Sequence, residues 1–188
     1  MKLAPLLILL FSLTIVGCTQ RTLSPYSASS GIARNPLRAQ ELTQQAADLI
    51  EHDPEKAERL LRDALTADLY HGPAHNNLGV LYLSQSKLYE AASEFEWARK
   101  LMPGHPDPRM NLALTLERAG RIDEAIATYD TALEVYPNHL PTIQALTRLQ
   151  LRHNQTDDRT TNFLKEIALR SNPQWQQWAR THMPRYSP

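Results

Sequence analysis

Residues 72–105 read GPAHNNLGVLYLSQSKLYEAASEFEWARKLMPGH, and residues 106–139 read PDPRMNLALTLERAGRIDEAIATYDTALEVYPNH. Placed one above the other, these two segments carry the same kind of residue at seven positions. The pairs are Leu78 with Leu112, Gly79 with Ala113, Tyr82 with Leu116, Ala91 with Ala125, Phe95 with Tyr129, Ala98 with Ala132, and Pro103 with Pro137. Self-similarity at a fixed period of this length is typical of a solenoid of stacked helical hairpins. The stretch therefore predicts two copies of one hairpin.

The paired positions have the residue sizes that two closely packed helices need. Gly79 and Ala113 are small on the first helix of each hairpin, and Ala91 and Ala125 are small on the second. Large aromatic side chains then fill the space between the helices. A proline closes each segment, because proline cannot donate to the helical ladder. Gly120 suits the turn inside its hairpin, since glycine accepts the left-handed conformation that follows many helices.

The spacing of these residues resembles the tetratricopeptide repeat family. The family pattern is Leu-Gly-x-x-Tyr in a first helix, Ala-x-x-x-Phe-x-x-Ala in a second helix and a closing proline. The segments 89–92 and 123–126 also resemble the start of the family's second helix. The early aromatic residue of the first helix is replaced by His75 and Arg109. The resemblance implies antiparallel helix pairs stacked into a right-handed superhelix.

Two weaker repeats flank the central pair and extend the solenoid over residues 37–183. We expect an all-α fold, an α-solenoid of about four helix-turn-helix repeats closed by a C-terminal capping helix. The expected repeats are 38–71, 72–105, 106–139 and 140–173, and the capping helix is 173–182. The expected helices are about 37–51, 54–68, 73–85, 88–101, 106–119, 122–135, 140–153, 157–171 and 173–182. Trp175 and Trp178 share one face of the last helix, either as a cap over the last repeat or as an exposed docking face.

The N-terminus has the features of an export signal. An apolar run over residues 3–16 follows Met1 and Lys2, and it is short for a membrane-spanning helix. Residues 15–18 read Ile-Val-Gly-Cys, which resembles the lipobox of bacterial lipoproteins. The resemblance implies a signal peptide over residues 1–17 and acyl chains such as palmitate attached through the thiol of Cys18. An ordinary cleaved signal peptide is the alternative.

The segment from residue 18 to residue 36 is rich in Ser, contains Pro and Gly, and lacks an apolar period, so it predicts a flexible tether. We expect the protein to be lipid-anchored in the bacterial cell envelope. Thr19, in place of Asp, favours the periplasmic face of the outer membrane if the bacterium is Gram-negative. The expected membrane contact is therefore through the lipid alone.

Composition and motifs argue against nucleic-acid binding and catalysis. Lys+Arg and Asp+Glu both number 20, which gives no electrostatic attraction to nucleic acid. His71, His105 and His139 are one repeat apart, so each belongs to a different loop and they cannot share one metal ion. No nucleophile, phosphate-binding or dinucleotide motif is present. We expect no enzyme activity, no metal and no cofactor.

The first helices offer the surface where a partner is expected. In the family these helices line the concave face, and the resemblance places nine residues there. They are Asn76, Val80, Leu83, Met110, Leu114, Arg118, Gln144, Arg148 and Arg152. This groove would be apolar in its middle and basic toward its C-terminal end. Of the Lys/Asn/Arg set that binds chaperone tails in some relatives, only Asn76 has a match. The alternative is that these side chains only pack or solvate the solenoid.

The expected function is that of an adaptor that binds a protein or peptide in this groove. Assembly of a pilus, a secretion apparatus or another envelope complex is a role that this layout suits. The alternative is a structural scaffold that associates with itself through its repeat faces or its terminal helix.

Overall fold

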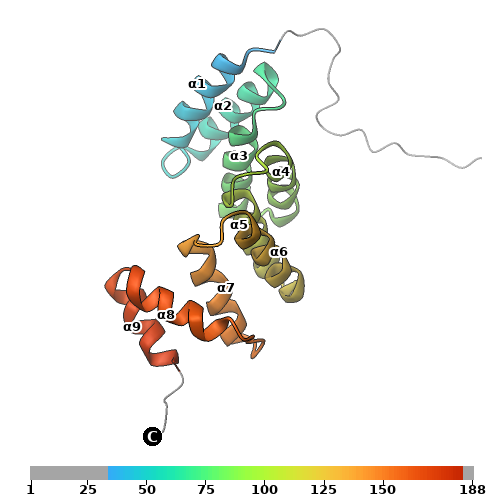
Figure 1. Ribbon diagram of the computed structural model, residues 1–188. Helices are drawn as coiled ribbons and strands as arrows, with labels where there is room; N and C mark the ends of the chain where they lie inside the picture. Colours follow the sequence, from blue (N-terminus) through green and yellow to red (C-terminus); the bar gives the residue numbers. More distant parts are fainter. Residues whose placement is uncertain (1–33, 184–188) are drawn as a thin grey trace, which may run out of the picture. The chain divides into compact units, whose positions relative to one another are not determined.

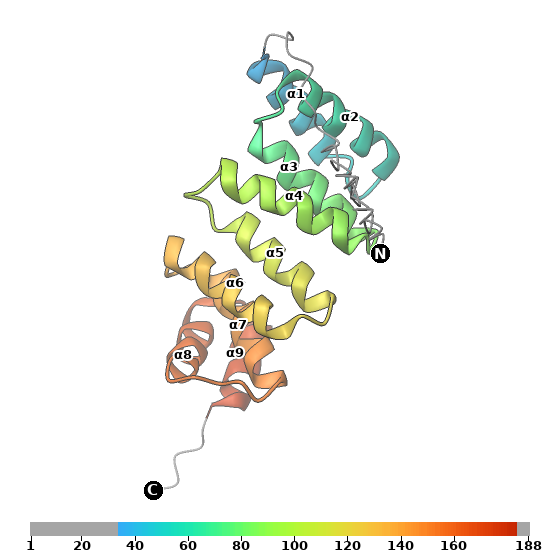
Figure 2. The same cartoon turned by 90° about the vertical axis from the view of Figure 1, so that its right-hand side faces the viewer.

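The computed structural model describes residues 34–183, and within this range the fold is all-α with nine helices and no strand (Figures 1 and 2). The helices are α1 (Pro36–Ala47), α2 (Pro54–Ala67), α3 (Gly72–Ser84), α4 (Leu88–Leu101), α5 (Asp107–Arg118), α6 (Ile122–Val135), α7 (Leu140–Arg152), α8 (Thr160–Arg170) and α9 (Pro173–His182). The expected solenoid of helix pairs with a terminal helix is confirmed. The expected signal peptide and nearly all of the expected tether lie outside the described residues.

Consecutive helices pack on each other along the whole described chain. The hairpins α1/α2, α3/α4 and α5/α6 are each tightly packed, and α8 contacts both α7 and α9. Second helices also contact the first helix of the next hairpin, as α4 does with α5 and α6 does with α7. The core is therefore continuous from one repeat to the next, which is how a solenoid buries apolar surface that a single hairpin would leave exposed.

Side-chain caps set the start of three helices. The Asp53 carboxylate accepts from the backbone N–H of Lys56 at the start of α2, and Asn35 and Asn172 cap α1 and α9 in the same way. A proline follows each of these caps at the first helical position, where a missing N–H costs nothing. The Asp-Pro and Asn-Pro pairs thus act as start signals for these helices.

One turn conformation recurs at the same position of three hairpins. Ser86, Gly120 and Asn154 have φ angles of 60°, 76° and 54°, and they are spaced 34 residues apart. The residue after each donates its backbone N–H to a carbonyl five residues earlier, for example Lys87 to Tyr82 at 2.9 Å. This is the left-handed helix end of a Schellman motif. The turn therefore carries the 34-residue period into the weakly conforming pair α7/α8.

Two helices are shorter than the sequence pattern predicts. α1 ends at Ala47 and not near residue 51, because the backbone N–H of Leu49 turns back to the carbonyl of Ala46 and residues 48–52 form turns. α8 begins at Thr160 and not at residue 157, because the Asp157 carboxylate accepts from the backbone N–H groups of Arg159 and Thr160. In both places local hydrogen bonds compete with the helical ladder.

The same Asp157 is held in its charged form. Partial burial opposes ionisation of its carboxyl group, but hydrogen bonds from Arg159 and Gln150 outweigh burial and lower the pKa of Asp157. The turn before α8 is therefore held by charge-assisted hydrogen bonds, which are stronger than bonds between neutral groups.

The residues that carry the repeat pattern lie inside the solenoid. Twelve of the fourteen are buried: Leu78, Gly79, Tyr82, Ala91, Phe95, Ala98, Leu112, Ala113, Leu116, Ala125, Tyr129 and Ala132. The two prolines, Pro103 and Pro137, are exposed just after α4 and α6. A Cβ atom placed on Gly79 would lie 2.6 Å from Cε1 of Phe95, so α3 and α4 approach too closely for a larger residue there.

Candidate partner-binding surface

The first helices of neighbouring repeats are joined to each other directly. α1 contacts α3 and α3 contacts α5, whereas within residues 34–183 the second helices α2, α4 and α6 have no comparable contacts with one another. Three hydrogen bonds, each between residues 35 apart, connect α3, α5 and α7. They are Asn111 Nδ2 to Asn76 Oδ1 at 3.1 Å, Arg118 Nη1 to the Leu83 carbonyl at 3.1 Å, and Arg152 Nη1 to Glu117 Oε1 at 3.0 Å. The first helices of neighbouring repeats therefore pack more closely together than the second helices do.

The structure places most of the predicted groove residues at the surface of these first helices. The partly exposed ones are Asn76, Val80, Met110, Leu114, Gln144 and Arg148, and the exposed ones are Arg118 and Arg152. Among the partly exposed ones, two already have a side-chain hydrogen bond: Asn76 accepts from Asn111, and the Gln144 amide donates to Ser171 Oγ at 2.7 Å. The partly exposed apolar side chains come from α3 and α5, and the arginines from α5 and α7.

Leu83 is the one predicted groove residue that is buried, and only 6% of its surface is exposed. It stands one position earlier in its repeat than Arg118 and Arg152 do in theirs. One residue along a helix is a rotation of about 100°, which turns Leu83 into the core. The residue in register with the two arginines is Ser84, which is exposed. The 34-residue period thus relates Ser84, and not Leu83, to Arg118 and Arg152.

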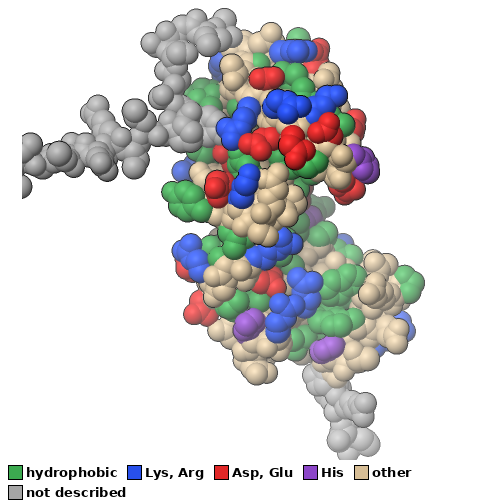
Figure 3. All heavy atoms as spheres, turned by 180° about the vertical axis from the view of Figure 1, so that it is seen from behind, with side chains coloured by type: hydrophobic (Ala, Val, Ile, Leu, Met, Phe, Trp, Pro, Cys, Tyr) green, Lys and Arg blue, Asp and Glu red, His purple; other side chains and the backbone are tan. Residues whose placement is uncertain are grey.

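The basic end of the surface is built around one shared acid. Glu117 is 10% exposed, and its Oε1 lies 3.0 Å from Arg152 and 3.9 Å from Arg148. Its Oε2 accepts from the hydroxyl group of Tyr129, whose pKa is raised first by burial and then by the Glu117 charge. One carboxylate against two guanidinium groups leaves an excess of positive charge here. In Figure 3, basic and apolar side chains lie next to each other in the lower part of the face shown.

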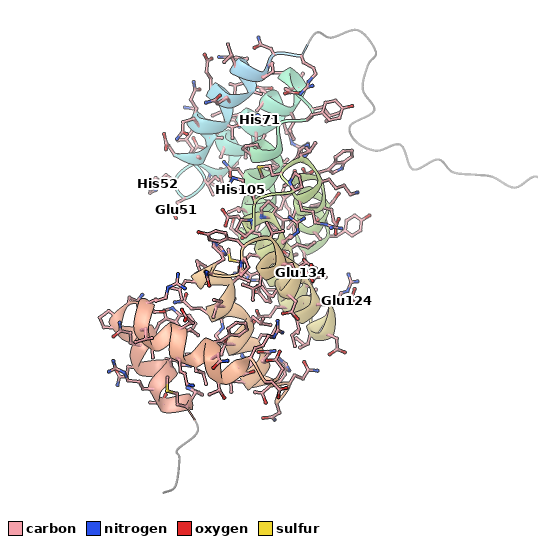
Figure 4. All side chains as sticks on the ribbon, in the orientation of Figure 1. Glu51, His52, His71, His105, Glu124 and Glu134 are labelled. Carbon is pink, nitrogen blue, oxygen red and sulfur yellow. The ribbon has the colours of Figure 1, made fainter. Side chains whose placement is uncertain are left out.

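The three histidines spaced one repeat apart, His71, His105 and His139, lie in different loops. His71 precedes α3 and His105 lies between α4 and α5, and Figure 4 shows the two in separate loops. His139 precedes α7, where its Nδ1 lies 2.7 Å from Thr142 Oγ1. Burial lowers the pKa of His71. Among the described residues there is no cluster of three or more His, Cys, Asp or Glu side chains that could hold a metal ion.

The terminal helix α9 packs on α8. Its two tryptophan rings meet edge to face, with centroids 5.1 Å apart, and both side chains are partly exposed. Ala179 is the buried residue of this helix. The tryptophans are thus neither fully covered nor fully free. Within residues 34–183, no helix has the length and apolarity needed to cross a bilayer.

Comparison with known proteins agrees with this geometry. Residues 83–149 match the tetratricopeptide repeat family, so the chain carries this type of repeat. None of the curated proteins matches the chain.

Several solved structures share the fold. The first TPR of Spaghetti (RPAP3), bound to the HSP90 peptide SRMEEVD, has 18% identity and a TM-score of 0.61, with 66% of this chain and 99% of that chain covered. Pseudomonas aeruginosa PilF has 19% identity and a TM-score of 0.66, with 73% and 63% covered. MamA from Desulfovibrio magneticus RS-1, from residue 41 to its end, has 15% identity and a TM-score of 0.58, with 77% of each chain covered. At these identities the likeness establishes the fold.

Proposed function

We propose that this chain is a non-enzymatic adaptor of the bacterial cell envelope that holds a segment of a partner protein against its first helices. The partner is a component of a pilus, a secretion apparatus or another envelope complex. The observation that carries the proposal is the row of partly exposed apolar and basic side chains on α3, α5 and α7.

The arrangement of that row suits an extended or helical segment. Val80, Met110 and Leu114 are partly exposed, so a partner can cover apolar surface there. Met110 has a flexible side chain that adapts to different partner shapes. The arginines at the other end would fix the direction of the segment, because charge pairing contributes orientation and specificity. The neighbour bound to the HSP90 peptide is an example of this fold holding a peptide.

Charged substitutions in the middle of the row test this proposal. The double variant Met110→Glu with Leu114→Glu should recover its specific partner from crosslinked envelopes at least about tenfold less well, because two carboxylates would have to be desolvated on binding. Ala127→Glu with Thr131→Glu is the matched control: it adds the same charges at the same i, i+4 spacing, at exposed positions of α6. Circular dichroism of both variants checks the fold. The groove proposal fails if the first variant keeps every specific partner.

The second part of the proposal is the anchor at Cys18, which lies outside the described residues. Several acyl chains on one residue give stable attachment, since each buried CH₂ group contributes about 0.8 kcal/mol and one chain alone is marginal. Together with a tether of Ser and Pro residues, the lipid would keep the solenoid close to the membrane while leaving its surface open.

Cys18→Ser should move the protein from the membrane fraction to the soluble fraction of the envelope. The reason is that serine cannot receive the thioether-linked lipid on which the attachment depends. Fractionation followed by immunoblotting measures the change, and Ser24→Ala in the same segment is the control. An unchanged membrane fraction for Cys18→Ser would contradict the anchor and leave the groove proposal intact.

A further inference from the structure

The loops that join one repeat to the next lie along one edge of the solenoid. Four contacts connect them in order: Arg34 Nε to Asp68 Oδ1 at 2.8 Å, Gly72 against the Met102 side chain, Asp107 Oδ1 to His139 Nε2 at 3.5 Å, and Arg170 Nη2 to the Asn138 carbonyl at 3.2 Å. In Figure 2 the α4–α5 loop lies on the left, whereas the turns inside the hairpins α3/α4 and α5/α6 lie on the right. We define the inter-repeat edge as these loops with their adjoining helix ends, residues 34–38, 68–72, 100–109, 134–140 and 169–172.

Exposed apolar side chains gather on this edge. Within residues 34–183, five large apolar or aromatic side chains are exposed, and four of them belong to the inter-repeat edge. The four, each more than half exposed, are Leu37, Tyr70, Tyr136 and Leu169. The fifth is Tyr89, the second residue of α4, which begins at the opposite edge. A one-sided distribution of this kind marks an interaction surface, whereas scattered single residues need no explanation.

The residue types on the edge suit the interface between lipid and water. Tyrosine is enriched at the headgroup level of bilayers, because its ring is apolar and its hydroxyl group is polar. The ring of Tyr70 also holds a cation, since the Arg34 guanidinium group lies 5.1 Å from its centroid. The exposed Lys100 is offset by two exposed acids, Asp107 and Glu134. The edge therefore has little net attraction to anionic lipid, and its apolar side chains would carry the contact.

The chain enters the described fold at this edge. Arg34 is the first described residue, and its guanidinium group donates to both carboxylate oxygens of the buried Asp68, at 2.8 and 3.1 Å. Cys18 precedes Arg34 by 16 residues, and a flexible chain of this length spans roughly 20–24 Å. The opposite edge is farther from such an anchor by the length of a helix, about 21 Å for the 14 residues of α4. A tether from Cys18 thus keeps the inter-repeat edge nearest the membrane.

We propose that the inter-repeat edge lies against the lipid headgroup region of the anchoring membrane through Leu37, Tyr70, Tyr136 and Leu169. The inference rests on the anchor in the proposed function and adds a second contact to the one through lipid. Tethering supplies an effective concentration in the roughly millimolar range, so contacts too weak to bind a membrane alone become occupied. The later halves of α3 and α5 would then point away from the bilayer and stay open to a partner.

Photo-crosslinking of the full chain tests the proposal. The photoreactive residue p-benzoylphenylalanine replaces the tyrosine at position 70, 136 or 89, and circular dichroism checks each fold. The chain is purified from membranes in detergent and reconstituted into vesicles of phosphatidylethanolamine and phosphatidylcholine, and mass spectrometry counts the lipid adducts. We expect at least about tenfold more lipid adducts at positions 70 and 136 than at 89, because the latter lies a helix length from the membrane.

Two results of this experiment would overturn the proposal. Equal yields of lipid adducts at the three positions would mean that the edge has no preferred contact with the bilayer. Adducts between two copies of the chain, in place of lipid adducts at positions 70 and 136, would assign the edge to self-association. Position 89 is a demanding control, since Tyr89 is the most exposed of the three tyrosines at 85%.

Matched variants show whether the apolar side chains are responsible. The photoreactive residue is now placed at Gly104 of the same edge, where a Cβ atom would meet nothing within 4 Å. Tyr70→Ser with Tyr136→Ser should lower the lipid adducts there at least about threefold, and Tyr89→Ser should leave them within about twofold. Replacing part of the phosphatidylcholine by anionic phosphatidylglycerol should change the yield less than about twofold, because the edge carries both signs of charge. A large rise with anionic lipid, or no loss in the double variant, contradicts the role given to the apolar side chains.

Failure of this inference can be told from failure of the proposed anchor. Fractionation of Cys18→Ser tests the anchor by itself. If that variant leaves the membrane while positions 70 and 136 of the unsubstituted chain give no lipid adducts, the edge assignment is wrong and the anchor stands. If these positions give lipid adducts while Cys18→Ser stays in the membrane fraction, the edge contacts the membrane and the anchor is the part that fails.

Discussion

Replacing Phe95 by Ala is expected to lower the free energy of unfolding by about 3–5 kcal/mol. Phe95 is fully buried in α4 and lies against Gly79 of α3, so its removal leaves a cavity between the two helices that pack most tightly. A domain of ordinary stability has only about 5–15 kcal/mol in total. Urea unfolding followed by circular dichroism at 222 nm measures the loss. Tyr89→Ala is the control, because this aromatic residue of the same helix is 85% exposed.

The contact with Gly79 gives a sharper form of the same prediction. Gly79→Ala should destabilise the protein, although alanine favours a helix by about 1 kcal/mol over glycine, because the new methyl group would overlap the buried Phe95 ring. In the Phe95→Ala background the overlap is gone, so Gly79→Ala should become stabilising. The double-mutant cycle reports this change of sign. Additive effects of the two substitutions would show that the close approach of α3 and α4 contributes nothing.

Much of the fold could be predicted because the pattern is local and repeated. A small residue at position 79, an aromatic residue at 95 and a proline at 103 all recur 34 residues later, and each has one simple steric reason. The turns between helices are harder to predict from the sequence. Glycine at 120 signals a left-handed residue, whereas Ser86 and Asn154 adopt the same conformation at some steric cost and carry little signal of their own. Only their register with Gly120 identifies them.

The structure differs from the prediction where local hydrogen bonds or a shift of one residue override the 34-residue pattern. The carboxylate of Asp157 binds backbone N–H groups and delays the start of α8, a choice that depends on the position of Arg159 and Gln150. Leu83, predicted at the partner surface, is buried because its position is one residue out of register with Arg118 and Arg152. Neither error changes the number of helices, but the second one changes which side chain a partner would meet.

The cavity between α7 and α9, which is lined by Arg148, Leu151, Arg152, Trp178 and His182, could not be predicted from the sequence. The sequence predicts Arg148 and Arg152 as basic surface residues and Trp178 as part of a cap or of a docking face, but nothing in the pattern places these side chains together. The reason is physical: α9 belongs to no repeat, so its packing is set by tertiary contacts that have no counterpart elsewhere in the chain. The unsatisfied Nε of Arg148 likewise becomes visible only once the neighbours of that side chain are known.

His75→Ala is expected to lower the free energy of unfolding by about 3–5 kcal/mol, because it removes a fully buried ring together with its hydrogen bonds. His75 occupies the place of the early aromatic residue of the repeat, and its side chain is fully buried. Its Nδ1 lies 2.7 Å from Glu94 Oε2, and its Nε2 lies 2.9 Å from the Leu69 carbonyl. The ring also stacks on Trp97, with centroids 5.8 Å apart and an angle of 15° between the planes.

The acceptor groups around His75 determine where the protons on its ring lie. A carbonyl can only accept, so Nε2 of His75 donates to Leu69, and one proton lies between Nδ1 and the Glu94 carboxyl group. A buried polar group that loses such a bond costs about 1–3 kcal/mol, and more if it is charged. The histidine therefore joins the loop before α3, the helix α3 itself and the helix α4 through bonds that a phenyl ring could not make.

Two further variants separate the bonds from the ring. His75→Phe keeps a ring of similar size against Trp97 but removes both hydrogen bonds, so we expect a loss of about 1–3 kcal/mol. Glu94→Gln keeps a group that can bond to Nδ1 and should cost less than His75→Phe. The exposed His105→Ala is the control, within about 0.5 kcal/mol of the unmodified protein. Urea unfolding followed by tryptophan fluorescence measures all four. If His75→Phe is as stable as the unmodified protein, the ring alone matters at this position, and the pair with Glu94 contributes nothing to stability.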